Sequence, residues 1–193
     1  MKILAFTDLH GNIKLLNKLI ELSKKKKVSA IVCAGDISFF GAELIGLIKK
    51  FEDVNTSLII IPGNHETPRS IQEITRKFNF VKNIHGRVFS LNDCLFFGCG
   101  GSKITPFSTP FELDEKEFEI KLKKFKNKGS SKFIFVVHEP PYNTALDYIG
   151  GTHMGSKVIR KFIEIYKPDY CICGHFHENS GKEDNIHGTT ILN

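Results

Sequence analysis

The sequence lacks long apolar runs, and its cysteines do not follow the spacing of a zinc ribbon. Its longest apolar segments, residues 58–61 and 133–137, are far shorter than the roughly 20 residues of a membrane-spanning helix. The first residues also lack the length and cleavage site of a signal peptide, so we expect no membrane association. The five cysteines are an odd number, which predicts reduced thiols and a cytoplasmic location rather than a disulfide framework.

The net charge of the chain excludes few classes of function. The chain has 27 Lys and Arg against 21 Asp and Glu, a net charge of +6. Much of the excess lies at residues 24–27 and 121–128, which we interpret as solvated helix ends. The charge is also compatible with anionic substrates, nucleic acid included, although no aromatic residue interleaves with residues 24–27 to form a stacking platform.

Expected strands alternate with expected helices, a pattern typical of an α/β fold, and 193 residues suffice for one buried core. We expect strands at residues 2–7, 29–34, 58–61, 132–137, 169–173 and 189–192. A hairpin is expected from residues 87–91 and 95–98. The apolar periodicity predicts helices at 12–26, capped by Asn12, and at 42–51, 70–78, 114–128 and 155–166. Residues 102–110, with two prolines, are expected to form a loop.

Polar side chains follow five of these strands. They are Asp8 and His10, Asp36, Asn64 and His65, His138, and His175 and His177. Ligands of open α/β sheets bind at the carboxyl ends of the strands, so these side chains converge if the strands are neighbours. A single histidine of this kind is more often structural, but the same placement after five strands is a much stronger signal.

Carboxylate, amide oxygen and imidazole together are ligands for Mn, Fe, Zn or Ni. Seven residues are candidate ligands: Asp8, His10, Asp36, Asn64, His138, His175 and His177. Seven are too many for one tetrahedral site, but they suit two ions if one carboxylate bridges them. The two aspartates cancel two of the four positive charges, and the other two suit a hydroxide and a phosphate ester.

A hydroxide held between two cations is a nucleophile at neutral pH, because metal binding lowers the pKa of water to about 7. The ions also stabilise charge that develops on the attacked phosphoryl group. His65, beside the candidate ligand Asn64, is then placed to protonate the leaving oxygen.

The polar clusters read as DLH (8–10), GD (35–36), GNHE (63–66), a histidine at 138 and GHFH (174–177). In order and spacing they resemble the calcineurin-like metallophosphoesterase superfamily over residues 8–177. The resemblance implies a four-layer α/β/β/α sandwich of two mixed β-sheets. It implies a first metal held by Asp8, His10 and His177, and a second held by Asn64, His138 and His175. It further implies that Asp36 bridges the metals and that His65 is the general acid or stabilises the transition state.

Two further segments, TPFSTPFE (105–112) and GTHMGSKVIRKFIE (151–164), resemble a branch of small predicted phosphoesterases that includes brain metallophosphoesterase-domain phosphodiesterases. By this resemblance Thr152, His153 and Gly155 border the substrate, although His153 also fits a loop or helix-capping role. We expect one domain, residues 1–193. The span between His65 and His138 exceeds that of the most compact members, so residues 67–131 are expected to be an inserted region near the active site.

The segment GDISFFG (35–41) lacks the Asp-Arg pair that protein Ser/Thr phosphatases of the superfamily carry after GD. This departure argues against a phosphoprotein phosphatase and leaves phosphate recognition mainly to the metals. The sequence therefore predicts a metal-dependent hydrolase, preferentially a phosphodiesterase, that uses in-line attack by a metal-bridging hydroxide. Two divalent transition-metal ions are expected, Mn first, with Fe, Ni, Co or Zn as alternatives.

The expected substrate is a small phosphate ester or a nucleotide. Two alternatives stay open: a nuclease acting on DNA or RNA, and a metal-free protein-interaction scaffold of the same fold. The full set of ligand types argues against the scaffold, and the length of the chain argues against the extra domains that nuclease members carry. The oligomeric state is also left open, a homodimer included.

Overall fold

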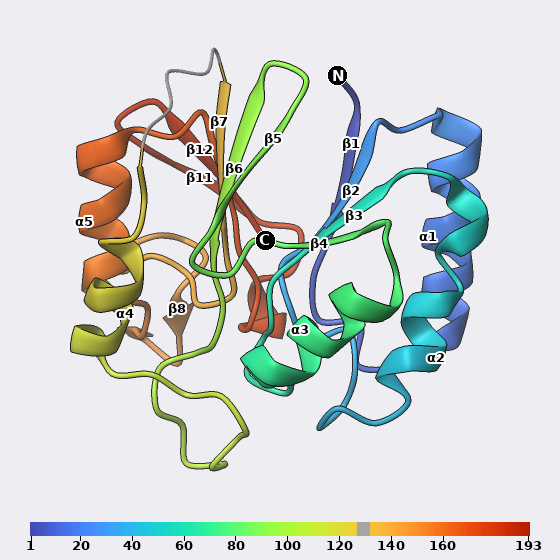
Figure 1. Ribbon diagram of the computed structural model, residues 1–193. Helices are drawn as coiled ribbons and strands as arrows, with labels where there is room; N and C mark the ends of the chain where they lie inside the picture. Colours follow the sequence, from blue (N-terminus) through green and yellow to red (C-terminus); the bar gives the residue numbers. More distant parts are fainter. Residues whose placement is uncertain (127–131) are drawn as a thin grey trace.

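The computed structural model describes residues 1–126 and 132–193, and two β-sheets that face each other form its centre (Figure 1). Helices cover the outer face of each sheet, which gives four layers in the order α/β/β/α. The α/β sandwich expected from the sequence is therefore confirmed. No helix of the described residues has the length and apolar character needed to cross a membrane.

The first sheet has four strands in the order β1-β2-β3-β4, and all of its described pairings are parallel, so it is not the mixed sheet that the resemblance implied. Its strands are β1 (Ile3–Phe6), β2 (Ala30–Cys33), β3 (Ser57–Ile60) and β4 (Val81–Asn83). Its helices are α1 (Ile13–Lys26), α2 (Leu44–Lys49) and α3 (Pro68–Lys77), with the 3₁₀ turn η1 (Glu52–Val54) before β3. Asn12 caps α1 as expected, because its Oδ1 accepts a hydrogen bond from the Leu15 N–H at 3.0 Å.

The second sheet is mixed, with six strands in the order β11-β12-β10-β7-β6-β5. Its strands are β5 (Val88–Leu91), β6 (Cys94–Cys99), β7 (Lys132–Val137), β10 (Tyr170–Ile172), β11 (Glu183–Ile186) and β12 (Thr189–Leu192). Helices α4 (Glu115–Leu122) and α5 (Lys157–Tyr166) cover its outer face (Figure 1). Two short strands, β8 (Tyr148–Ile149) and β9 (Thr152–His153), form a separate hairpin, and the 3₁₀ turn η2 (His177–Asn179) follows β10.

Successive residues of the central strands enter different cores, because side chains alternate across a sheet. On β7, Phe135 and Val137 pack toward α4 and α5, whereas Ile134 and Val136 pack between the two sheets. β2 alternates in the same way between the core under α1 to α3 and the core between the sheets. Both faces of these strands are therefore buried, which is why their sequences read as continuous apolar runs.

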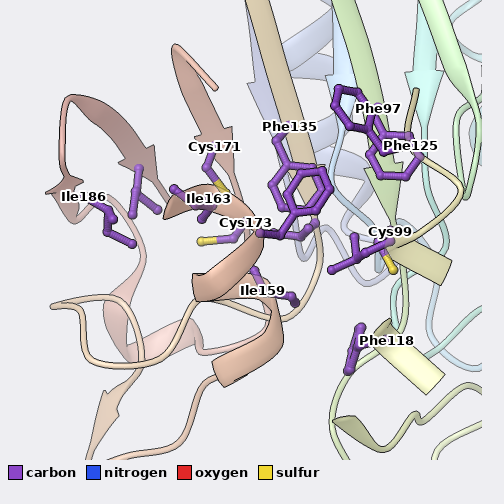
Figure 2. Close-up of a cluster of buried hydrophobic side chains, with 14 of the residues drawn as sticks. Phe97, Cys99, Phe118, Phe125, Phe135, Ile159, Ile163, Cys171, Cys173 and Ile186 are labelled. Carbon is purple, nitrogen blue, oxygen red and sulfur yellow. The ribbon is translucent and has the colours of Figure 1, made fainter. Parts of the chain in front are cut away.

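The core under α4 and α5 is rich in phenylalanine (Figure 2). The Phe135 ring lies 4.5 Å from the Phe162 ring and is stacked on Phe97 at 6.1 Å. Cys171 and Cys173 both enter this core, because residues two apart in a strand point to the same face of the sheet. Burial raises the pKa of nearby Cys99 to about 12, so this thiol stays protonated at neutral pH.

Some expected elements differ from the structure. The helix expected at 114–128 ends at Leu122, because the N–H of Phe125 bonds back to the carbonyl of Leu122 and turns its ring onto Phe133, 4.7 Å away. Residues 127 and 128 lie outside the described part of the chain. The helix expected at 42–51 covers only Leu44–Lys49, because Glu43 before it has a left-handed φ of 54°.

The stretch expected as an insertion, residues 67–131, contributes to both sheets. Its described part supplies β4 to the first sheet and β5 and β6 to the second. No pattern in the sequence had indicated β4, β8, β9 or β11. β4 and β11 lie at sheet edges, and β8 and β9 are two residues long, so none has a sustained apolar pattern.

We predict that Phe135→Ala lowers the free energy of unfolding by about 3–5 kcal/mol, because the ring is fully buried and its removal leaves a cavity. Urea denaturation followed by circular dichroism measures the change. The control is Ile120→Ala on α4, whose side chain is 62% exposed and whose loss should alter stability by no more than about 0.5 kcal/mol. Equal losses for the two variants would contradict this account of the core.

Candidate metal centre

The side chains that follow five strands meet at one end of the sandwich. β1, β2 and β3 supply them from the first sheet, and β7 and β10 from the second. Parallel hydrogen bonds tie the first two loops together: the N–H groups of His10 and Gly11 donate to the carbonyls of Asp36 and Ile37, each at 2.9 Å. The convergence expected from the sequence is therefore present in the structure.

One group contains Asp8, His10 and His177. The Nε2 atoms of the two histidines are 3.1 Å apart, and Asp8 Oδ1 lies 3.4 Å from His177 Nε2 and 3.8 Å from His10 Nε2. Two loops more than 160 residues apart in the sequence thus place three ligand atoms around one point.

A second group surrounds the amide oxygen of Asn64. Asn64 Oδ1 lies 2.9 Å from His138 Nε2 and 3.0 Å from His175 Nδ1. His138 is fully buried, and its Nδ1 lies 2.9 Å from the backbone carbonyl of Ala34, which fixes the ring so that Nε2 faces the centre.

Asp36 lies between the two groups. Its Oδ2 is 3.7 Å from His10 Nε2 in the first group and 3.4 Å from His138 Nε2 in the second. Its Oδ1 accepts the backbone N–H of His65 at 2.9 Å, which holds the carboxylate in this orientation. Asp36 is therefore placed to serve both groups, and it lies closer to His138 than does Asp8, whose Oδ1 is 4.0 Å from His138 Nε2.

The donor set fits divalent transition metals. Asp8 Oδ2 accepts hydrogen bonds from the Thr7 hydroxyl at 2.8 Å and the His175 N–H at 3.0 Å, but the buried Oδ1 has no hydrogen-bond partner among the described residues. An unpaired buried carboxylate oxygen is costly unless a cation completes it. Mixed imidazole, carboxylate and amide ligands without thiols suit Mn, Fe, Ni, Co or Zn.

The charges at the centre shift the pKa values of its members in opposite directions. Burial alone would lower the pKa of His138, but the carboxylates of Asp36 and Asp8 raise it to about 10. Burial would raise the pKa of Asp8, but the neighbouring His177 and His138 lower it well below its ordinary value. Burial and the neighbouring His138 lower the pKa of His175 to about 3. The two ionised carboxylates thus hold positive charge at this point.

The glycines of the motifs allow the ligand loops to approach closely. A Cβ at Gly63 would collide with the carboxylate of Asp36, and one at Gly174 would collide with the side chains of Thr7 and Asp8. Several ligands also have left-handed backbones, with φ of 53° at Asp8, 52° at Asp36 and 71° at His175. Such strain in non-glycine residues is typical of functional sites.

Glu66 is a functional residue to which the sequence analysis gave no role, although it ends the motif GNHE. Its buried carboxylate accepts the N–H groups of Asp36 and Gly63 at 3.0 Å, and the N–H and hydroxyl of Ser38 at 2.8 and 2.7 Å. Glu66 therefore fixes the loop after β2 against the loop after β3. The signal in the sequence was an acidic residue that directly follows two candidate site residues.

Glu139, next to His138, was also missed. Its carboxylate is fully buried, and Oε2 accepts the N–H of Lys103 at 2.9 Å and lies 3.9 Å from His175 Nε2. Burial raises the pKa of Glu139 to about 8. Glu139 is thus placed to orient His175 from the side opposite Asn64.

His65 lies beside the two groups and lines the same cleft. Its Nδ1 accepts the N–H of Phe40 at 3.4 Å, and its Nε2 is 3.9 Å from Asp36 Oδ2. The Phe39 ring is stacked on the imidazole at 5.0 Å, and the Phe40 ring meets it edge-on at 4.6 Å. These contacts fix the ring and leave Nε2 toward the centre.

The ligand groups open into a cleft of about 1150 Å³. The loop expected at 102–110 forms part of its wall through residues 103–107 and 109. His153 is not among the described residues that line this cleft, whereas Met154 is. The His153 Nδ1 lies 2.8 Å from the buried Asp147 Oδ1, and its ring lies near those of Tyr142 and Tyr148.

Comparisons with known proteins show the family of the chain and a shared fold. An uncharacterized protein of Methanocaldococcus jannaschii, MJ1162, is 38% identical over 205 residues, which cover all of this chain and 87% of that protein. The crystal structure of TT1561 of Thermus thermophilus superposes with a TM-score of 0.79 at 18% identity, covering 98% of this chain and 87% of that one.

A structure described as a novel archaeal phosphodiesterase superposes with a TM-score of 0.57 at 18% identity, over 100% of this chain and 82% of that one. At this identity the two structural matches show a shared fold. The model of the calcineurin-like phosphoesterase family matches residues 1–179, which include all the candidate ligands. The chain therefore belongs to the calcineurin-like phosphoesterase family.

Proposed function

We propose that this protein is a phosphodiesterase that works with two divalent metal ions. Membership of the family implies a hydrolase of phosphate esters. The observation that carries the dinuclear proposal is the position of Asp36 Oδ2, within 3.7 Å of ligand atoms of both groups. The choice of a diester as substrate is supported by the structural similarity to a protein described as an archaeal phosphodiesterase.

In this proposal the first ion would be held by Asp8, His10 and His177. The second would be held by Asn64, His138 and His175, and Asp36 would be shared by both. Bound metal ions supply Lewis acidity and a hydroxide nucleophile at neutral pH. Mn is the first choice, with Fe, Ni, Co and Zn as alternatives, because the ligands are imidazole and oxygen atoms without thiols.

His65 supplies the proton that the leaving oxygen needs. Its Nε2 faces the centre, 3.9 Å from Asp36 Oδ2. When the P–O bond breaks, a protonated His65 passes the proton on Nε2 to the leaving oxygen and becomes a neutral imidazole. The packing of Phe39 and Phe40 holds the donor in place throughout.

The alternatives expected from the sequence have less support. A metal-free scaffold would have no need of a buried, unpaired ligand atom, yet Asp8 Oδ1 lacks a hydrogen-bond partner among the described residues. A nuclease needs cationic side chains along the nucleic-acid backbone, and Lys103 is the single Lys or Arg among the described residues that line the cleft.

Metal binding should stabilise the folded chain. After chelation, adding Mn²⁺ at about 100 times its dissociation constant should raise the thermal midpoint by roughly 5–10 °C. Asp36→Asn should show a much smaller rise, because the variant loses a bridging charge. The control is Asp53→Asn, an exposed residue of η1 outside the centre, which should respond as the natural protein does. The absence of any Mn²⁺ effect on the natural protein would favour the scaffold.

Activity should fall most when the residue shared by both groups is changed. Asp36→Asn is expected to lower kcat/KM for bis-p-nitrophenyl phosphate by more than ~100-fold, because it perturbs both ion positions. Asn64→Ala and His138→Ala should also remove most activity, by loosening the second ion alone. Near-normal turnover by Asp36→Asn, with its metal content measured in parallel, would contradict the assignment of two ions.

The proton-donor role of His65 predicts a loss that depends on the leaving group. His65→Ala should lower kcat by ~10²-fold or more for esters of poor leaving alcohols, within the usual range for acid catalysis. The loss should shrink for p-nitrophenyl esters, whose leaving group needs no proton, while metal content stays unchanged. An equal loss with good and poor leaving groups would show that His65 acts in another way.

A further inference from the structure

Large apolar side chains stand exposed around the mouth of the metal centre. Phe39 and Phe40 lie on the loop after β2 of the first sheet, a few residues beyond Asp36, and are 58% and 51% exposed. Ile104 and Phe107, on the loop after β6 of the second sheet, are 74% and 77% exposed. All four line the same cleft as the candidate ligands. Apolar side chains grouped at a polar site mark a binding surface, because each would gain from being covered.

Both parts of this apolar rim, Phe39–Phe40 and Ile104–Phe107, are held by specific contacts. The Phe39 ring is stacked on His65 and meets the Phe40 ring edge-on at 4.9 Å. The loop that carries Phe107 is tied by Glu112, whose Oε1 accepts the hydroxyls of Thr105 and Thr109 at 2.6 Å and the Thr109 N–H at 2.9 Å. The Phe39 and Phe40 rings and the loop that carries Phe107 are therefore preorganised for a ligand.

The cleft has little positive charge beyond the metal centre. Lys103, the one Lys or Arg among the described residues that line it, directs its Nζ to the carbonyls of Met154 and Gly155 at 2.9 and 3.3 Å. Glu178 adds an acidic side chain to the same lining. A second phosphate of a polyphosphate or a nucleic-acid strand would find no free cationic side chain in the described part of the cleft.

We propose that the cleft binds a phosphodiester that has a single phosphate group and carries an aromatic ring on one of its two ester groups. This ring packs on Phe39 and Phe107. The proposal rests on the phosphodiesterase function above. The ring is assigned because exposed phenylalanines supply faces and edges that favour another aromatic ring. Hydrolysis adds OH to phosphorus and H to the leaving oxygen, breaks one P–O ester bond and releases a monoester and an alcohol.

The test compares esters that share one leaving group. The Mn²⁺-loaded full chain is assayed with p-nitrophenyl phenyl phosphate, p-nitrophenyl methyl phosphate and p-nitrophenyl cyclohexyl phosphate. We expect kcat/KM for the phenyl ester to be about tenfold higher than for the methyl ester. It should also be several-fold higher than for the cyclohexyl ester. Because the leaving group is constant, these ratios report contacts of the other ester group. A cyclohexyl ester as good as the phenyl ester would overturn the aromatic assignment.

Variants then locate the contact. The phenyl-to-methyl ratio should fall severalfold in Phe39→Ala and in Phe107→Ala, and to near one in the double variant. Tyr170→Ala is the matched control, because Tyr170 is an exposed aromatic residue at the start of β10, whereas the metal centre follows the end of that strand. Tyr170→Ala should keep the ratio of the natural protein. An unchanged ratio in the double variant would overturn the proposal.

A binding measurement gives a readout that does not depend on turnover. In calorimetric titrations, phenyl phosphate should bind the natural protein several-fold more tightly than methyl phosphate, and the Phe39→Ala/Phe107→Ala variant should lose this difference. An oligothymidine at 0.15 M salt should not compete with phenyl phosphate; strong competition would favour the nuclease instead. If none of the three esters is hydrolysed, the phosphodiesterase function itself fails. Equal hydrolysis of all three overturns only the aromatic preference.

Discussion

The apolar core between the two sheets is what brings the parts of the site together. Val32 of β2, Ile59 of β3 and Val136 of β7 meet there, fully buried. This contact sets the carboxyl ends of strands from both sheets at the same edge. The ligands that follow β1, β2 and β3 can therefore face those that follow β7 and β10, although no single loop contains a complete set.

The metal centre requires buried charge, and the loops around it meet that requirement with hydrogen bonds. Glu66 accepts backbone N–H groups from the loops after β2 and β3 of the first sheet, and Asp8 accepts one from the His175 loop of the second. Each bond satisfies a buried carboxylate oxygen that would otherwise destabilise the fold. In Asp8 and Asp36, one oxygen is held by the backbone while the other faces the centre. The same hydrogen bonds thus stabilise the loops and aim the ligands.

The cleft divides recognition between two kinds of surface. The ligand groups at its base suit a phosphate, whereas Phe39 and Phe107 at its mouth offer exposed apolar surface. Lys103 is the single Lys or Arg among the described residues of the lining. The absence of the Asp-Arg pair after GD leaves phosphate recognition to the base of the cleft. Selectivity among esters would then come from the organic group, where contact with phenylalanine rings distinguishes one ester from another.

Local patterns in the chain were enough to predict many of its elements and the candidate ligand set. Strand 132–137, the hairpin around Asn92 and the Asn12 cap were predicted from apolar runs and turn residues, and the ordered motifs identified the seven candidate ligands. The folded arrangement was needed to find the roles of Glu66 and Glu139, the edge strands β4 and β11, and the presence of both Phe39 and Phe107 in the lining of one cleft. The edge strands were missed because they lack a sustained apolar pattern. The roles of Glu66 and Glu139 and the shared cleft of the two phenylalanines depend on residues about 30 or more positions apart, and no local periodicity or spacing specifies which distant segment a side chain will meet.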